Sequence, residues 1–114
     1  MSSLAMILIS VLLGALGQIG FKYGVTRIPE TGDLLTKISA GWPIGLGLLL
    51  YGLSTILWIY VLRSVELSYA YPLISLGYVL VFLASYFLFN EPIGLARLAG
   101  LALIIAGITL VARS

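Results

Sequence analysis

Residues 4–21 read LAMILISVLLGALGQIGF, a stretch in which no side chain is charged. A helix needs about 20 predominantly apolar residues to cross the hydrocarbon core of a bilayer. Lys22 and Tyr23 follow at once, and a long-stemmed cation beside an aromatic ring is typical of the membrane–water interface. The stretch therefore predicts a membrane-spanning helix over residues 4–25. We expect a mature helix rather than a cleaved signal peptide, because no basic residue precedes the apolar run.

Three further apolar stretches predict spans over residues 42–62, 69–89 and 93–112. Of the 114 residues, 61% are hydrophobic and 9% are charged, whereas an ordinary soluble domain carries roughly 25% charged residues. Four spans use most of the chain and leave no room for a second domain. We therefore expect an all-α integral membrane protein, a single domain over residues 1–114 with a bundle of four transmembrane helices that pairs as a dimer.

The first connection, TRIPETGDLLTKISAGW over residues 26–42, is the longest polar stretch. Leu34, Leu35 and Ile38 recur in it at helical spacing, with Asp33 and Lys37 among them. This pattern is compatible with one or two helical turns lying in the membrane interface. It is equally compatible with a solvated loop, and the sequence leaves both alternatives open.

The third and fourth spans contain prolines and glycines, which begin, bend or end helices. Pro72 stands near the start of the third span, where a missing N–H costs little, and Gly77 lies further in as the candidate hinge. The sequence Asn90-Glu91-Pro92 then separates the two spans. We expect Pro92 to begin the fourth helix and Asn90 or Glu91 to cap it.

The basic residues are distributed unevenly over the two sides of the predicted membrane domain. Two basic residues lie on the side that holds the N-terminus, the second connection and the C-terminus. Four basic residues lie on the side that holds the first and third connections. The two are Arg63 and Arg113; the four are Lys22, Arg27, Lys37 and Arg97. The positive-inside rule then places the first and third connections in the cytoplasm and both termini outside. With so small a bias, insertion in both orientations stays an alternative.

Several function classes are excluded by residue types that the chain lacks. It has no cysteine and no histidine, so thiolate chemistry, the usual metal ligands and a histidine base are missing. We expect no enzyme activity, no metal and no cofactor. The net charge of +2 is scattered along the chain, and we expect no nucleic-acid partner. No acidic residue falls in mid-span, which disfavours a proton-coupled antiporter.

Uncharged polar and small residues concentrate in the first span. Gln18 is the most polar residue well inside it, and its amide either bonds another helix or lines a substrate cavity. A stripe of mostly small residues shares one helical face: Ser10, Gly14, Gly17, Phe21 and Gly24. Such a stripe permits close helix contact, which we favour, and it is also compatible with the thin wall of a cavity.

The last two spans offer a second polar face and a packing face. Tyr71, Ser75 and Tyr78 follow the i, i+4, i+7 rule of one helical face. Tyrosine at a span end is usually an interfacial residue, but Ser75 and Tyr78 lie deeper and are candidates for lining a cavity. Gly100 and Gly107 are seven residues apart on one face of the fourth span, and this spacing favours helix packing in a dimer.

These residues also carry a family resemblance. Over nearly its whole length, and most strongly from about residue 45 onward, the chain resembles the drug/metabolite transporter superfamily, in particular its small four-helix EamA-type members. Among those it is most similar to the subunits of a bacterial flippase for aminoarabinose linked to undecaprenyl phosphate. The likeness rests on Gly17-Gln18 with Lys22, Leu57-Trp58, Ala70-Tyr71-Pro72 with Ser75-Leu76, Glu91-Pro92, and Gly100 with Ile104-Ile105-Ala106-Gly107.

The small multidrug resistance transporters are more distant relatives in this comparison. They resemble the chain at Lys22 and at the paired glycines of the last span. Their first span carries a glutamate that binds substrate and protons, and alignment on Lys22 puts Gly14 at that position. This departure argues against proton-coupled drug export.

The resemblance implies helices that pair around a shared cavity and a substrate with a polar head and an isoprenoid tail. The predicted function is a transporter or flippase subunit in the bacterial inner membrane, acting on a polyprenyl-phosphate-linked sugar or a similar lipid. Its expected partners are membrane lipids and a second copy or a related four-helix subunit. The candidate cavity residues are Gly14, Gln18, Lys22, Arg63, Tyr71, Ser75, Tyr78 and Glu91.

Two alternative functions remain open at this stage. One is a small multidrug-type exporter of cationic compounds or metabolites, which predicts proton release when substrate binds. The other is a scaffold that stabilises a partner enzyme without transport. A scaffold predicts tolerance of Gln18→Ala and Ser75→Ala, and loss of function on Gly100→Leu through lost packing.

Overall fold

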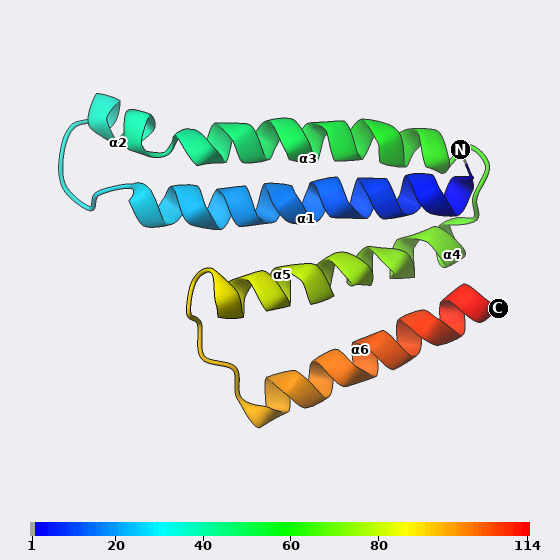
Figure 1. The fold of residues 1–114 in the computed structure, drawn as a ribbon. Coiled ribbons are helices and arrows are strands. Elements are labelled where there is room, and N and C mark those ends of the chain that lie inside the picture. The colour runs from blue at the N-terminus through cyan, green and yellow to red at the C-terminus, as the bar shows by residue number, and fades with distance from the viewer. Residues whose placement is uncertain (1) are drawn as a thin grey trace.

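The computed structural model describes residues 2–114, and every regular element in that range is helical (Figure 1). Four segments are long and apolar enough to cross a membrane. This confirms the all-α architecture with four candidate spans. The elements are α1 (Ser3–Arg27), α2 (Leu34–Ala40), α3 (Trp42–Val61), α4 (Leu67–Ala70), the 3-10 helix η1 (Tyr71–Ile74), α5 (Ser75–Phe87) and α6 (Leu95–Arg113).

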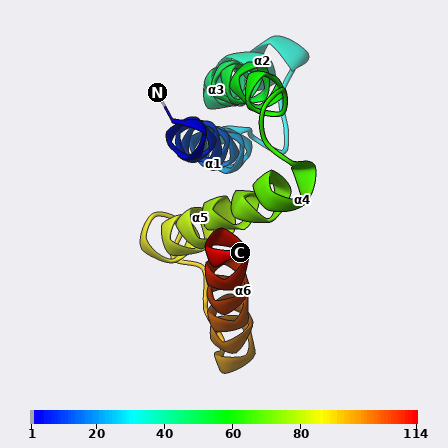
Figure 2. The same cartoon turned by 90° about the vertical axis from the view of Figure 1, so that its right-hand side faces the viewer.

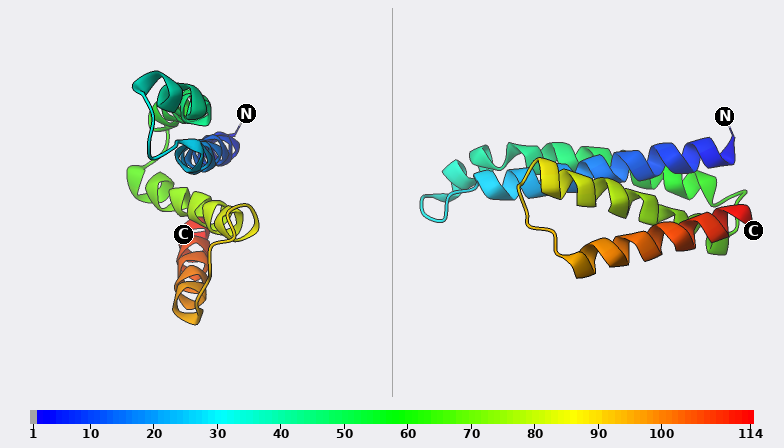
Figure 3. Two further views of the ribbon diagram at one scale, coloured as in Figure 1. Left: turned by 90° about the vertical axis from the view of Figure 1, so that its left-hand side faces the viewer. Right: turned by 60° about the horizontal axis from the view of Figure 1, so that its bottom comes forward.

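The long helices form a row rather than closing around a common axis. α1 runs antiparallel to α3, α5 packs on another side of α1, and α6 packs on η1 and α5 (Figures 1 and 2). The molecule measures 52 × 36 × 18 Å, so it is thin in one direction (Figure 3). The two ends of the described chain lie at one end of the row, and α2 and the α5–α6 connection lie at the other.

The contact between α1 and α3 is a contact of backbones. A Cβ atom added to Gly47 would lie 2.7 Å from the carbonyl oxygen of Gly17, and one added to Gly17 would lie 2.9 Å from that of Gly47. Further along α1, the Ser10 hydroxyl donates a hydrogen bond to the Ser54 carbonyl at 2.8 Å. The close-packing interpretation of the small-residue stripe is therefore confirmed for Gly17, which α3 approaches as only glycine allows.

A small apolar core lies toward the end of the row that holds the termini. Ile7 and Val61 are fully buried there, and the cluster also contains Val11, Ala70, Leu73 and Ile108. Most other apolar side chains on the four long helices are exposed, for example Leu103 at 75%. Such a surface suits hydrocarbon surroundings and needs no burial inside the protein.

The first connection resolves the alternative that the sequence left open. Residues 34–40 form the helix α2, and the Asp33 carboxylate accepts a hydrogen bond from the Thr36 N–H at 2.9 Å. This is an N-cap, which satisfies one of the unpaired donors of the first turn. Within α2, Lys37 and Ala40 are half-buried, the other residues are exposed, and none is buried, as expected of a helix lying at an interface.

The connection between the last two spans corrects the sequence prediction. α6 begins at Leu95 with Gly94 as its N-cap, so Pro92 does not begin the helix and neither Asn90 nor Glu91 caps it. Instead Asn90 adopts a positive φ of 53°, and the Glu91 N–H donates to the Ser85 carbonyl at 3.0 Å. This bond reaches back six residues and satisfies one of the carbonyls at the C-terminal end of α5. Glu91 is therefore bonded to the end of α5, and the next helix starts only at Leu95.

The third span is not one uniform helix. Pro72 lacks an N–H, and the chain winds as the 3-10 helix η1 over Tyr71–Ile74 before α5 begins. Gly77, the predicted hinge, is buried within α5, where an added Cβ would lie 3.3 Å from Cγ1 of Val11. The departure from α-helical geometry thus lies at Pro72, and a bending role for Gly77 stays a prediction.

The α1–α3 contact predicts a stability difference between two glycines of the same helix. Gly47→Ala should lower the free energy of unfolding by about 1–3 kcal/mol, because the new methyl group pushes the two backbones apart. Gly52→Ala is the matched control, since an added Cβ there meets nothing within 4 Å. Thermal unfolding in detergent measures both variants, and equal midpoints would contradict the backbone contact.

The Asp33 cap predicts a pH dependence confined to α2. Hydrogen bonds from the side chain and backbone of Thr36 lower the pKa of the Asp33 carboxyl below its ordinary value. The cap is therefore fully present above the ordinary pKa of about 3.9 and is lost as the pH falls through the lowered value. NMR titration of the Thr36 amide should follow this transition. Asp33→Ala should abolish it, and Glu30→Gln should not.

Candidate functional site

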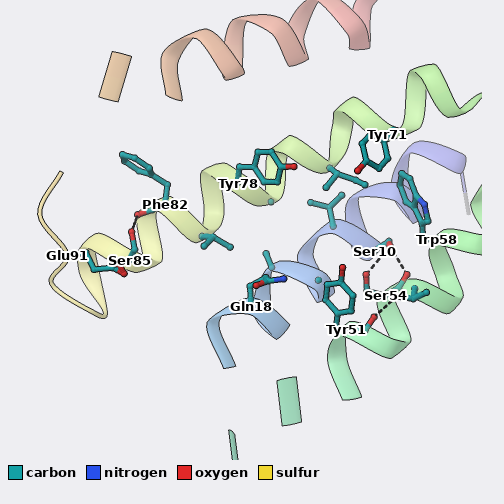
Figure 4. Close-up of a pocket in the computed structure, with 17 residues that line it drawn as sticks. Ser10, Gln18, Tyr51, Ser54, Trp58, Tyr71, Tyr78, Phe82, Ser85 and Glu91 are labelled. Atoms are coloured by element: carbon teal, nitrogen blue, oxygen red, sulfur yellow. Dashed lines mark hydrogen bonds between the residues drawn. The ribbon is translucent and has the colours of Figure 1, made fainter. Parts of the chain in front are cut away.

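A cavity of about 910 Å³ lies among α1, α3 and the segment η1–α5 (Figure 4). α1 packs against α3 and also against α5, so side chains from all three helices meet at one place. α6 contributes none of the residues that line the cavity. The described chain therefore bounds the cavity with three of its four long helices.

α1 and α3 supply the first wall. α1 contributes Ser10, Gly14 and Gln18, and α3 contributes Tyr51 and Ser54. Ser10 and Ser54 are held by their mutual hydrogen bonding, with hydroxyl oxygens 3.4 Å apart. The Gln18 amide points toward the cavity in Figure 4 and makes no hydrogen bond to another helix within residues 2–114. Its donors and acceptor are thus available to a bound molecule.

The segment η1–α5 supplies the second wall. Tyr71, Tyr78 and Ser85 line it, and the Ser85 hydroxyl donates to the Phe82 carbonyl at 2.7 Å. Ser75, predicted on the same face, is not among the lining residues. A 3-10 helix has 3.0 residues per turn, so Ile74 takes the place below Tyr71 that an α-helix would give to Ser75.

The charged candidates lie outside the middle of the cavity. Arg63 lies in the α3–α4 connection and does not line the cavity. Glu91 lines the cavity from the α5–α6 connection. Lys22 lies one helical turn beyond Gln18, and its Nζ is 4.0 Å from Oε1 of Glu91. These two side chains form a loose ion pair next to the lining residues Gln18 and Ser85.

Sequence reasoning missed the contribution of α3. Tyr51, Ser54, Thr55 and Trp58 all line the cavity. Their spacing of three and four residues places them on one helical face, and two hydroxyl residues in the middle of an apolar span were a usable signal. The stripe of small residues in α1 is easier to recognise in a sequence than isolated hydroxyl residues in an apolar helix.

The site carries no acid at mid-depth. The four acidic residues Glu30, Asp33, Glu66 and Glu91 all lie outside the four long helical segments. Residues 2–114 contain no group of three or more potential metal ligands. Hydroxyls, an amide and aromatic rings can bind sugar-like groups by hydrogen bonding and stacking, and they offer no nucleophile–base pair for covalent chemistry.

The two glycines of α6 lie apart from this cavity. A Cβ atom added at Gly100 or at Gly107 would meet nothing within 4 Å. Their face is therefore not used for packing inside the described chain, and their role in a dimer stays a prediction.

Known proteins resemble the chain over nearly its whole length. Residues 1–113 match the EamA-like transporter family. A protein of Pseudomonas aeruginosa named "Probable 4-amino-4-deoxy-L-arabinose-phosphoundecaprenol flippase subunit ArnE" is 40% identical over 114 residues, which cover 98% of each chain. A protein of Pseudomonas fluorescens with the corresponding name ending in ArnF is 38% identical over 108 residues, covering 87% of this chain and 79% of its own. No solved structure matches the chain.

The cavity predicts a pattern of thiol reactivity in the membrane. The native chain has no cysteine, so single cysteines report one position each. Ser85→Cys should react with a membrane-impermeant maleimide, because water in the cavity supports the thiolate form that reacts.

Leu83→Cys is the matched control two residues away. Leu83 is 46% exposed but does not line the cavity, so its thiol should face hydrocarbon and stay unlabelled. Equal labelling of both variants in sealed vesicles would contradict a water-accessible cavity.

Proposed function

The chain belongs to the EamA-like transporter family, and on that premise we propose that it is a flippase subunit for a polyprenyl-phosphate-linked amino sugar. The observation that carries the proposal is the cavity among α1, α3 and η1–α5. It has uncharged polar groups at mid-depth and charged groups at one end. We place the protein in the cytoplasmic membrane of a bacterium, because its relatives come from bacteria and their printed names describe such a lipid.

The cavity suits a substrate that is polar at one end and apolar over most of its length. The Gln18 amide and the hydroxyls of Ser54 and Tyr78 can replace the water that a sugar loses on entering the membrane. The three lining helices leave one side to be completed, as α6 takes no part in the lining. An isoprenoid tail can remain in hydrocarbon on that side while the head moves.

The same incompleteness supports a partner subunit. A chain whose helices lie in a row only 18 Å thick cannot enclose a large polar head by itself. The relatives carry two subunit names, ArnE and ArnF, and we propose a heterodimer with a related four-helix chain. Gly100 and Gly107 offer an unused helix face for that contact. Rocking of one subunit against the other would expose the cavity alternately to the two sides.

The rival functions are disfavoured by particular residues. Proton-coupled export of cationic drugs needs a titrating acid within the pathway, and the position expected for it is occupied by Gly14, which faces Ser54. A scaffold without transport needs no polar cavity, whereas the Gln18 amide lines one and bonds no other helix within residues 2–114.

Reconstitution into vesicles tests the proposal. The chain and a related partner subunit should move fluorescently labelled polyprenyl-phosphate amino sugar across the bilayer, and they should not move cationic dyes. Val81 lines the cavity, so Val81→Trp should fill it and reduce the rate by about tenfold, equivalent to about 1.4 kcal/mol.

Leu80→Trp is the matched control on the same helix. Leu80 is 39% exposed and lies outside the lining, so its substitution should leave transport near the native rate. Equal loss in both variants, or dye transport in place of lipid transport, would contradict the proposed function.

A further inference from the structure

We propose that Lys22 and Glu91 together recognise a headgroup that carries both a protonated primary amine and a phosphate. The Glu91 carboxylate binds the ammonium group, and the Lys22 ammonium binds the phosphate. The inference rests on the proposed function, since the relatives' printed substrate contains a 4-amino sugar joined to a phosphate. It adds which residues of this chain distinguish that substrate from other polyprenyl lipids.

The geometry of the Lys22–Glu91 ion pair allows each side chain to exchange its partner for a charged group of a ligand. Nζ of Lys22 and Oε1 of Glu91 are 4.0 Å apart, and the side chains are 52% and 37% exposed. An ion pair this long and this exposed contributes little to folding. Opening it costs correspondingly little, and each charge then becomes available to the opposite charge of a zwitterionic ligand.

Glu91 is held in place by its backbone and not by its side chain. Asn90 with its positive φ turns the chain at the end of α5, and the Glu91 N–H is fixed to the Ser85 carbonyl at 3.0 Å. Pro92 follows, and the residue before a proline is restricted to extended conformations. The carboxylate therefore starts from a fixed backbone next to the cavity residue Ser85 while its oxygens remain free to bind.

Lys22 is the cation whose ammonium lies beside the Glu91 carboxylate. Arg27 donates to the Ala40 carbonyl and lies over the rings of Tyr23 and Trp42. Arg97 donates to the Pro92 carbonyl at 3.4 Å. Lys22, by contrast, continues the α1 face of Gly14 and Gln18, both of which line the cavity. Its long stem allows the ammonium to reach a phosphate at the membrane surface.

Lys22 and Glu91 should contribute differently to substrate binding and to selectivity. Phosphate is shared by all polyprenyl-phosphate lipids, so Lys22 contributes to binding all of them. The amine distinguishes one lipid from the others, so Glu91 contributes to selectivity. Hydrogen bonds to charged groups are stronger than neutral ones, and leaving a carboxylate without its ammonium partner penalises an uncharged analogue.

Transport of two lipids in the same vesicles tests the inference: the free amino sugar lipid and its N-acetylated form, which has lost the positive charge. The native protein should prefer the free amine by about tenfold or more. Glu91→Gln should bring this ratio close to one, and Lys22→Gln should lower the rates for both lipids without changing their ratio. Glu66→Gln, an exposed acid at the other end of the row, should leave the ratio as it is in the native protein.

A charge reversal separates recognition from structural pairing. Lys22→Glu combined with Glu91→Lys restores an ion pair at the same place, so a purely structural pair predicts recovery of native transport. Recognition predicts continued loss, because the tail fixes the direction of the headgroup and its charges would meet like charges. Thermal midpoints in detergent should be unchanged by Glu91→Gln.

The outcomes are distinguishable from failure of the proposed function. If the native protein moves neither lipid, the flippase proposal is wrong. If it moves both lipids at equal rates, or if Glu91→Gln keeps the preference, the flippase proposal stands and the assignment of Lys22 and Glu91 is overturned. Recovery of selective transport in the charge-reversed protein would likewise overturn it.

Discussion

Two helix backbones touch where Gly17 of α1 meets Gly47 of α3. In hydrocarbon no hydrophobic force drives helices together, so association relies on close packing and on the few polar contacts available. This glycine contact, with the hydrogen bonds between Ser10 and Ser54 further along the same interface, fixes α1 and α3 as one unit. The remaining helices then pack against a defined surface of α1 or against each other.

The cavity follows from what that unit leaves uncovered. Close approach at the glycines lies toward one half of α1, and α5 reaches α1 through Gly77 against Val11. Larger side chains of α3 and α5, such as Tyr51 and Tyr78, line the hollow beside these contacts. Small residues permit the contacts, and both small and aromatic residues line the hollow.

The sequence predicts the architecture well, because the requirement for about 20 apolar residues per span is a strong physical constraint. Helix ends and faces are less determined. Pro92 was expected to begin α6, but the Glu91 N–H bonds the Ser85 carbonyl at the end of α5, and α6 begins only at Leu95. Ser75 was expected in the cavity on α-helical spacing, but Pro72 converts one turn to a 3-10 helix and shifts the register.

The sequence predicts the part of the candidate site that depends on the faces of single helices. Gly14, Gln18, Tyr71 and Tyr78 share faces that a helical wheel identifies, and all four line the cavity. Their neighbours on α3 depend on how α3 rotates about the Gly17–Gly47 contact, which no periodicity within one helix reveals. The Lys22–Glu91 pair joins residues far apart in the sequence, and the packing of α5 on α1 together with the turn at Asn90 places them side by side.

The distribution of charge bears on how a phosphate crosses this protein. A phosphate is costly to place in hydrocarbon without a counterion, and the four long helices hold no acid, with Lys22 near the end of α1 and Arg97 near the start of α6. A headgroup that carries an ammonium as well as a phosphate brings its own counterion, and its net formal charge is zero. Uncharged groups such as Gln18 and Ser54 are then sufficient at mid-depth. There the ammonium and phosphate of the headgroup neutralise each other and need hydrogen-bond partners more than charged side chains. Charges are required where the headgroup passes between water and the membrane, because there its ammonium and phosphate must be taken from water and oriented, and Lys22 and Glu91 lie together at one such end.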